Sequence, residues 1–371
     1  MKKISLILVA LAITASTAGC SQKNNTENTP AEEPAPAEML LTRLHALADS
    51  GLTAFGHHDD TAYGISWEYV ADSSDVKAVT GDYPAIINWD LGLVEVDSAR
   101  QLDGVPFDFM RAEIAKHHAR GGINSISWHP LNPLTGGNSW DVSTGATLTR
   151  IMADSAMVDT LAAWAGRAAD FVASLRDADG RRIPVMFRPW HEHTGTWFWW
   201  GINSGTPEEY VKLWEITRKA FDDRGLDNVV WVYSPDKSNV DTYDDYMSRY
   251  PGDEYVDVMG ADVYHFGNEE EFDRWIDATL GSAVRAAREH GKIAALSETG
   301  CEGLKVDNWY MQSLLPALQR WPVAFVTVWR NSPTKPGHFY VPYPGHPGEQ
   351  DFRDFHAQPR IAFCSDLNEN N

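Results

Sequence analysis

The chain has 371 residues, with 31 lysines and arginines against 52 aspartates and glutamates, which gives a formal net charge of −21. This charge excludes the clustered basic surface that binding to nucleic acid or to an anionic membrane surface requires. With 3 cysteines, a chain of this length cannot form a disulfide framework. The 15 tryptophans are a large number, and their flat amphipathic rings suit a sugar-binding cleft.

The first residues predict export. Two lysines precede an apolar run over residues 4–13, which is too short to span a bilayer as a helix and has the length of a signal-peptide core. The run ends in Thr17-Ala18-Gly19-Cys20, which resembles the lipobox of bacterial lipoproteins. We therefore expect residues 1–19 to be removed as a lipoprotein signal peptide and Cys20 to be lipidated. The alternative is ordinary cleavage near Ala18.

Residues 20–38 predict a flexible tether. After Cys20 they contain no aromatic or branched aliphatic residue, so they cannot bury a core. We expect attachment to the membrane by the lipid anchor only, with the folded part nearby. An acidic run directly behind the lipidated cysteine resembles the tag that some Gram-negative lineages use for surface display, and no such run follows Cys20. This favours a lipid-anchored position in the cell envelope that faces the periplasm rather than the cell surface.

From residue 39 onward, short apolar runs alternate with longer stretches of helical periodicity. Each run is nearly continuous in valine, isoleucine, alanine and aromatic residues, as expected for parallel strands that are covered on both faces. Eight such runs with a helix after each predict a single (β/α)8 TIM barrel, an α/β fold, over residues 39–365, followed by a C-terminal tail over 366–371. The runs cover residues 53–58, 85–91, 123–129, 183–191, 229–234, 256–264, 293–298 and 323–330.

Two connections carry local signals. Thr206-Pro207-Glu208-Glu209 is a capping box with proline at the first helical position, and the helix that it begins is expected to end at Gly225. The gap between the third and fourth runs is the longest, and we expect an insertion around residues 132–149.

Chemistry in such barrels sits at the C-terminal ends of the strands. The fourth run ends in Glu192 and the seventh in Glu298, and a carboxylate there costs several kcal/mol unless it is paired or hydrogen-bonded. Either acid alone could be a structural partner of Arg188. Together, on strands four and seven, they face each other across the mouth, which suits hydrolysis of a glycoside by an acid and a nucleophile.

The histidines at the strand ends do not predict a metal site. The spacing in His191-Glu192-His193 is not that of a helical zinc motif, and nothing defines a tetrahedral ligand set around His57 and His58. Hydrogen bonding to sugar hydroxyls is the better interpretation of His129 and His191. For His57, His58, His193 and His265 a structural role is equally compatible with the sequence. Because the sequence contains no serine elbow, phosphate loop or dinucleotide motif, we expect no cofactor, and we also expect no metal.

The segment Trp197-Phe198-Trp199-Trp200 lies between two glycines directly after Glu192. Four consecutive aromatic residues in a loop cannot all lie in the core, because loops run over the surface. We expect Trp197 and one other ring to line the cleft and the remaining rings to pack on the rim of the barrel. Cys301 lacks a nearby base and is interpreted as a small buried residue, and Cys364 as a C-terminal residue without a role in the site.

The segment Arg188-Pro189-Trp190-His191-Glu192, followed by Gly195-Thr196-Trp197-Phe198-Trp199-Trp200-Gly201, resembles the acid/base motif of glycoside hydrolase family 26, chiefly endo-β-1,4-mannanases. Leu296-Ser297-Glu298-Thr299-Gly300 resembles its nucleophile strand. The resemblance extends over about residues 51–330. It implies that Glu192 is the acid/base and Glu298 the nucleophile, in agreement with the barrel argument. His193-Thr194 stands where the family usually has Met-Asn, which changes the details of the subsite contacts.

The resemblance also implies a set of substrate-binding residues. They comprise His191 beside the acid, Trp197 and Trp329 as sugar platforms, and Tyr264, which is hydrogen-bonded to the nucleophile. His129 and Arg330 contact the sugar next to the scissile bond, and Arg188 is the arginine that opens the motif.

Three functions remain open at this point. The first is a retaining, lipid-anchored endo-β-1,4-mannanase that acts as a monomer on β-mannan, galactomannan or glucomannan and on manno-oligosaccharides. The second keeps the mechanism but acts on mixed-linkage β-glucan or xylan. The third is a lipoprotein that binds glycans without cleaving them. The presence of both Glu192 and Glu298 argues against the third, because a binding protein needs neither.

Overall fold

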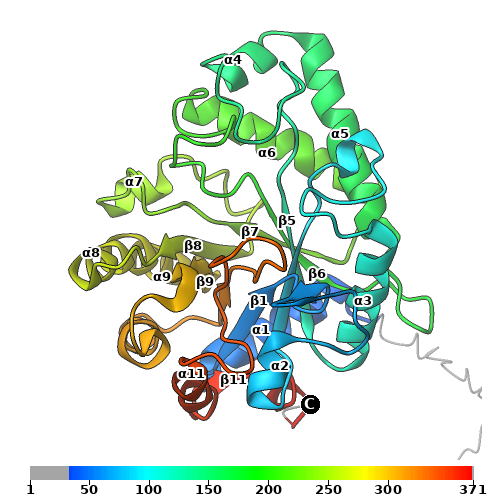
Figure 1. The fold of residues 1–371 in the computed structure, drawn as a ribbon. Helices are drawn as coiled ribbons and strands as arrows, with labels where there is room; N and C mark the ends of the chain where they lie inside the picture. The colour runs from blue at the N-terminus through cyan, green and yellow to red at the C-terminus, as the bar shows by residue number, and fades with distance from the viewer. Residues whose placement is uncertain (1–32, 370–371) are drawn as a thin grey trace, which may run out of the picture. The chain divides into compact units, whose positions relative to one another are not determined.

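The computed structural model describes residues 33–369; the predicted signal peptide and Cys20 lie outside them. Eight parallel strands form a closed barrel, because the last strand pairs with the first and the others pair in chain order (Figure 1). This confirms the predicted (β/α)8 fold. The strands are β1 (Thr53–His58), β4 (Ile86–Asp90), β5 (Ile123–Trp128), β6 (Val185–Pro189), β7 (Val229–Tyr233), β8 (Val258–Tyr264), β9 (Ile293–Gly300) and β10 (Phe325–Val328).

Three short strands lie beside the barrel. A ninth strand of the main sheet, β11 (Ile361–Ala362), pairs with the start of β1. A small antiparallel hairpin is formed by β2 (Tyr63–Gly64) and β3 (Trp67–Glu68).

Helical segments follow the barrel strands, as predicted. The longer ones are α3 (Phe107–Ala119), α5 (Ser155–Ala173), α6 (Pro207–Asp222) and α9 (Gly281–His290). The shorter ones are α2 (Asp75–Thr80), α4 (Thr147–Met152), α7 (Tyr243–Met247), α8 (Glu269–Trp275), α10 (Leu315–Arg320) and α11 (Glu349–His356). None of the described helices has the length and apolar character needed to cross a membrane.

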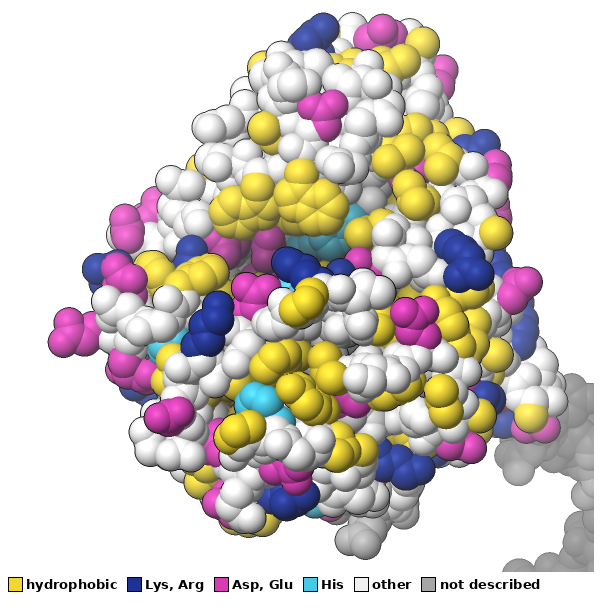
Figure 2. Space-filling model, in the orientation of Figure 1, with side chains coloured by type: hydrophobic (Ala, Val, Ile, Leu, Met, Phe, Trp, Pro, Cys, Tyr) yellow, Lys and Arg dark blue, Asp and Glu magenta, His cyan; other side chains and the backbone are white. Residues whose placement is uncertain are grey.

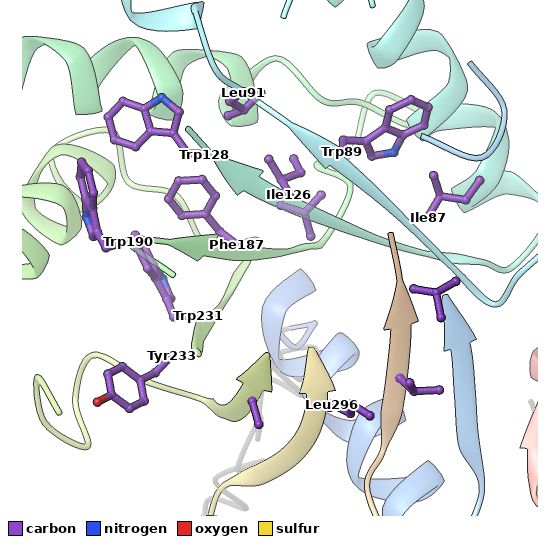
Figure 3. Packing of buried hydrophobic residues seen from close by; sticks show 14 of the residues in the cluster. Ile87, Trp89, Leu91, Ile126, Trp128, Phe187, Trp190, Trp231, Tyr233 and Leu296 are labelled. Carbon is purple, nitrogen blue, oxygen red and sulfur yellow. The ribbon is translucent and has the colours of Figure 1, made fainter. Parts of the chain in front are cut away.

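Side chains alternate between two cores, because successive residues of a strand point to opposite faces. Met186, Val230 and Val258 belong to an inner cluster inside the barrel, whereas Phe187 and Trp231 point outward toward the helices. Figure 3 shows this outer layer, with aromatic and aliphatic side chains from neighbouring strands packed in sequence around the barrel. Burial on both faces explains why the sequence of each strand is a continuous apolar run.

The helix α1 (Pro36–Ser50) packs Leu40, Leu44 and Leu47 into the inner cluster, beside the residues that begin the strands. This corrects the predicted boundary of the tether. Residues 36–38 belong to the helix, because Pro36 begins it and the Glu38 side chain accepts a hydrogen bond from the Ala35 backbone N–H at its first turn. The predicted C-terminal tail is also corrected, since α12 (Asp366–Glu369) is helical and Leu367 is buried.

The two predicted local features are present. In α6, the Thr206 side chain accepts from the Glu209 backbone N–H, which is the predicted capping box. The helix ends at Asp222, earlier than predicted, and Gly225 follows in a left-handed turn with φ of +58°. The insertion at residues 132–149 consists of turns that lead into α4.

Candidate active site

The two predicted acids meet at the C-terminal end of the barrel. Glu192 follows β6, Glu298 lies within β9, and β7 and β8 run between them in the sheet. Oxygen atoms of Glu192, Glu298 and a third carboxylate, Asp262 on β8, lie within 4.8 Å of one another. Figure 2 shows a hollow near the middle of one face, in which acidic, basic and histidine side chains gather below hydrophobic ones.

Glu192 is held in an unusual backbone conformation. Its φ is +53°, a left-handed value that residues with a side chain rarely adopt, and Trp190 has the same value. The Glu192 backbone N–H donates to the carbonyl of Ser234 at 2.8 Å, and its carbonyl accepts from the N–H of Gly195 at 2.9 Å. These bonds to a neighbouring strand and to the following loop fix the carboxylate at the mouth.

The environment of Glu192 favours its protonated form. Burial raises the pKa of this carboxyl well above its usual range, and the negative charges of Glu298, Asp236 and Asp262 raise it further. The Trp197 indole Nε1–H donates to Glu192 Oε2 at 2.8 Å. Burial and the neighbouring acids therefore keep Glu192 protonated to a higher pH than an ordinary glutamic acid.

Glu298 accepts hydrogen bonds from two side chains. The Tyr264 hydroxyl donates to its Oε1 at 2.6 Å, and the Arg188 guanidinium donates to its Oε2. Both carboxylate oxygens are thus oriented by donors, one of them cationic. The predicted contact between Tyr264 and the nucleophile candidate is present.

Arg188 donates hydrogen bonds to two acids of this cluster. It is 2% exposed, and its Nη1 also donates to Asp262 Oδ2 at 2.6 Å and to Ser234 Oγ at 3.1 Å. The structural role that we weighed for this arginine is therefore present, and its contact with a sugar stays a prediction. One guanidinium cannot neutralise three adjacent carboxylates, so this cluster retains a proton.

Sequence reasoning did not select Asp262. Asp262 precedes Tyr264 by two residues on one strand, so both point to the same face of the sheet, and this period-two signal could have identified it. Burial and the charge of Glu298 raise the pKa of Asp262, although Arg188 opposes them. The three carboxylates also offer oxygen ligands to a metal ion, but Arg188 already donates to two of them. The donor set fits acid chemistry better than metal binding.

A second missed acid, Asp90, orients the predicted histidine His129. Its Oδ2 lies 2.6 Å from His129 Nδ1 and accepts from Ser127 Oγ at 2.7 Å. Burial alone would raise the pKa of Asp90, but His129 and these hydrogen bonds lower it to about 2. Asp90 ends β4 as the other polar residues end their strands, and the same rule could have selected it.

His129 and His191 lie together, as predicted. Their Nε2 atoms are 3.1 Å apart, and the His191 carbonyl accepts from the Trp200 indole N–H at 2.8 Å. Burial, with the charge of Arg188, lowers the pKa of His191 well below its usual range, so this ring is neutral. His191 Nδ1 is buried and has no hydrogen-bond partner within residues 33–369.

Trp329, which follows β10, lies over the His58 ring, with 4.2 Å between ring centroids. Arg330 follows Trp329 and forms an ion pair of 2.6 Å with Asp103. Trp329 and Arg330 are both partly exposed, so they can contact a ligand.

The remaining strand-end histidines have internal contacts. His57 Nδ1 lies 2.7 Å from Asp60 Oδ1, and His265 Nε2 lies 3.0 Å from Glu269 Oε2. The His193 ring packs against Tyr210 and Tyr233. These contacts favour the structural interpretation of His57, His193 and His265.

The four consecutive aromatic residues divide as 1 partly exposed and 3 buried rings. Trp197 is the partly exposed one, at the acid. Phe198 is 3% exposed and packs against His129 and His191, whereas Trp199 and Trp200 are fully buried. Three of the four rings are therefore buried, whereas we expected two rings to line the cleft. Cys301 and Cys364 are both buried and free.

Residues 37–311 match the family model described as Glycosyl hydrolase family 26. The chain belongs to this family. It is 30% identical to a mannan endo-1,4-beta-mannosidase of Bifidobacterium adolescentis over 81% of this chain, and 31% identical to one of Bacillus subtilis over 57% of this chain. It spans 32% of the first and 57% of the second of these curated relatives.

Solved structures of family 26 are similar over most of the barrel. A β-mannanase from Bacteroides ovatus has a TM-score of 0.86 and 42% identity, with 89% of this chain and 95% of that chain covered. An endo-β-1,4-mannanase double mutant from Cellulomonas fimi has a TM-score of 0.80 and 32% identity, with 89% and 76% covered.

Proposed function

We propose that the protein is a retaining endo-β-1,4-mannanase that hydrolyses β-mannan, galactomannan or glucomannan and their oligosaccharides. The observation that carries this proposal is the pairing of Glu192 and Glu298, whose carboxylate oxygen atoms lie within 4.8 Å of each other. Burial and neighbouring acids favour the protonated form of Glu192, whereas Tyr264 and Arg188 donate hydrogen bonds to Glu298. Retaining glycosidases hold their two carboxyl groups about 5–5.5 Å apart, so that one can attack the sugar directly. The mannanase names of the relatives support the substrate.

In the first step, Glu298 attacks the anomeric carbon while Glu192 protonates the oxygen of the leaving sugar. The glycosidic bond breaks and a glycosyl ester forms on Glu298. In the second step, Glu192, now ionised, takes a proton from water. That water attacks the anomeric carbon and releases the Glu298 carboxylate. Two inversions give net retention.

The surrounding residues have two kinds of role in these steps: some orient Glu298 and others contact the sugar. Tyr264 and Arg188 orient Glu298 through the hydrogen bonds described above. His129, His191 and Arg330 would contact sugar hydroxyls. Trp197 and Trp329 would provide apolar platforms for sugar rings on the two sides of the scissile bond.

Hydrolysis of a panel of β-mannans, mixed-linkage β-glucan and xylan tests the proposal, with chromatography of the products over time. We expect mannans to be cleaved first, with intermediate oligosaccharides early in the reaction. An endoglucanase H of Acetivibrio thermocellus is 30% identical over 202 residues, which favours β-glucan as the second candidate substrate. A protein that binds mannan in an affinity gel but releases no sugar would instead be a glycan-binding lipoprotein.

We further propose that Cys20 carries the lipid anchor and that the enzyme is a monomer facing the periplasm. The apolar run, the small residues before Cys20 and the absence of an acidic run behind it support this. Radiolabelled palmitate should enter the wild type but not Cys20→Ala, and light scattering of the soluble part should give one chain. Protease added to intact cells should spare the protein; its loss while a periplasmic marker survives would indicate surface display.

A further inference from the structure

A buried arginine outside the catalytic cluster holds the loop that follows the acid. Arg249 lies after α7 and is 3% exposed. Its guanidinium donates to three backbone carbonyls of that loop: Gly201 at 3.4 Å, Ile202 at 2.8 Å and Gly205 at 2.5 Å. Among the described residues it has no carboxylate ion-pair partner. A buried cation without a countercharge is costly, so its partners point to a specific role.

Further contacts connect the loop that Arg249 holds to the acid Glu192. The Ile202 backbone N–H donates to the carbonyl of Gly195 at 2.9 Å, which closes the loop on itself. The six-membered ring of the Trp197 indole lies close to Gly195: a Cβ atom on this glycine would come within 2.4 Å of the ring. Trp197 Nε1 then donates to Glu192 Oε2. Each contact in this chain depends on the position of the preceding one.

Arg249 also contacts Tyr210, which is hydrogen-bonded to the turn that carries Glu192. The guanidinium lies over the Tyr210 ring at 5.6 Å, and the Tyr210 hydroxyl donates to the carbonyl of Trp190 at 2.8 Å. Trp190 and Glu192 are the two strained positions of this turn. Arg249 therefore contacts elements on both sides of the acid, one through the loop and one through Tyr210.

We propose that Arg249 is a positioning residue that sets the proton-donating geometry of Glu192 through the loop of residues 195–205. It touches no substrate. This proposal rests on the proposed glycoside hydrolysis. Arginine suits the role because its planar fork directs several donors at fixed angles, which a lysine ammonium does not.

The test compares Arg249→Met and Arg249→Lys with Arg218→Met as a matched control. Arg218 also stacks on an aromatic ring, at 4.6 Å from that of Trp231, and donates to one carbonyl, but it does not contact the loop. Two readouts are used: amide hydrogen exchange at Ile202, and kcat/KM on mannotetraose and on 2,4-dinitrophenyl β-mannobioside. The aryl group leaves without a proton, so its cleavage reports nucleophilic attack without the acid.

For Arg249→Met we expect faster exchange at Ile202 and a fall of about 10- to 100-fold in kcat/KM on mannotetraose, because a small misplacement of an acid is costly. The aryl substrate should change by less than about twofold, and Arg249→Lys should lie between. Arg218→Met should alter thermal stability only.

Equal losses on both substrates, or wild-type exchange at Ile202, would overturn the positioning role. If the wild type cleaves neither substrate, the proposed function fails. The exchange measurement then still decides whether Arg249 holds the loop.

Discussion

The Tyr264 hydroxyl lies 2.6 Å from Glu298 Oε1 and donates to it. Burial and the charge of Glu298 raise the pKa of Tyr264 well above its usual range, so the phenol keeps its proton. Because Arg188 donates to the other oxygen, the carboxylate has two fixed donors and cannot rotate freely. The carboxylate of the proposed nucleophile is therefore positioned by the barrel before any substrate binds.

Replacing Tyr264 by phenylalanine should keep the fold and lower kcat. A lost hydrogen bond to a charged group costs about 1.5–3 kcal/mol, which corresponds to a decrease of about 10- to 100-fold. Steady-state kinetics on manno-oligosaccharides and a melting curve measure both effects. Tyr343→Phe is the control, since this half-buried tyrosine lies outside the acid cluster. An unchanged kcat in the Tyr264 variant would favour a packing role.

Glu298→Ala and Glu192→Ala should differ by substrate. Without its nucleophile the enzyme should cleave neither mannan nor an aryl mannoside. Without its acid it should still transfer the sugar of an activated aryl mannoside to Glu298, because that leaving group needs no proton. Azide should then accelerate turnover of the Glu192 variant only. Identical behaviour of the two variants, with no azide effect, would contradict the assigned roles.

The anomeric configuration of the product distinguishes attack by Glu298 from attack by water. Oxygens of Glu192 and Glu298 lie within 4.8 Å, which leaves too little room for a water molecule between acid and sugar as in inverting enzymes. Early proton NMR spectra of the new reducing end should therefore show the β-anomer first. Initial appearance of the α-anomer would show inversion.

The pH dependence of kcat/KM should fall on the alkaline side as Glu192 loses its proton. Its raised pKa means that the acid stays protonated above the usual range of a glutamic acid, and activity is lost as the pH rises through that pKa. Trp197→Phe removes a donor that stabilises the ionised form, so the alkaline limb should move up by about one pH unit. Trp321→Phe, whose indole donates to Asp277 instead, should leave the limb in place.

Asp90→Asn should make stability less dependent on acid pH. The pKa of Asp90 is lowered to about 2 from 3.8, so its stabilisation is present above pH 3.8 and is lost as the pH falls toward 2. The shift corresponds to about 2 kcal/mol in the free energy of unfolding. Urea titrations at pH 6 and pH 2.5 should show the variant about 2 kcal/mol less stable at pH 6, with a smaller gap at pH 2.5. A constant gap would assign the loss to packing; exposed Asp108→Asn is the control.

The sequence alone determined the barrel and the two acids that are proposed to be its catalytic pair. Parallel strands buried on both faces produce continuous apolar runs, and their C-terminal ends must converge, so Glu192 and Glu298 could be placed together without coordinates. The capping box of α6 is equally local, because four adjacent residues make it. Such features depend on patterns within a short stretch or on a general rule of the fold.

Only the tertiary structure decided which partner each of these groups has. Arg188 and Glu298 are 110 residues apart, and Arg249 meets the carbonyl of Gly205 across 44 residues. An arginine can pair with many acids or carbonyls, and periodicity does not select among them. The pairing of Arg188 with Glu298 and Asp262, and the link from Arg249 to the acid, follow from distances and burial that exist only once the strands and loops have packed together.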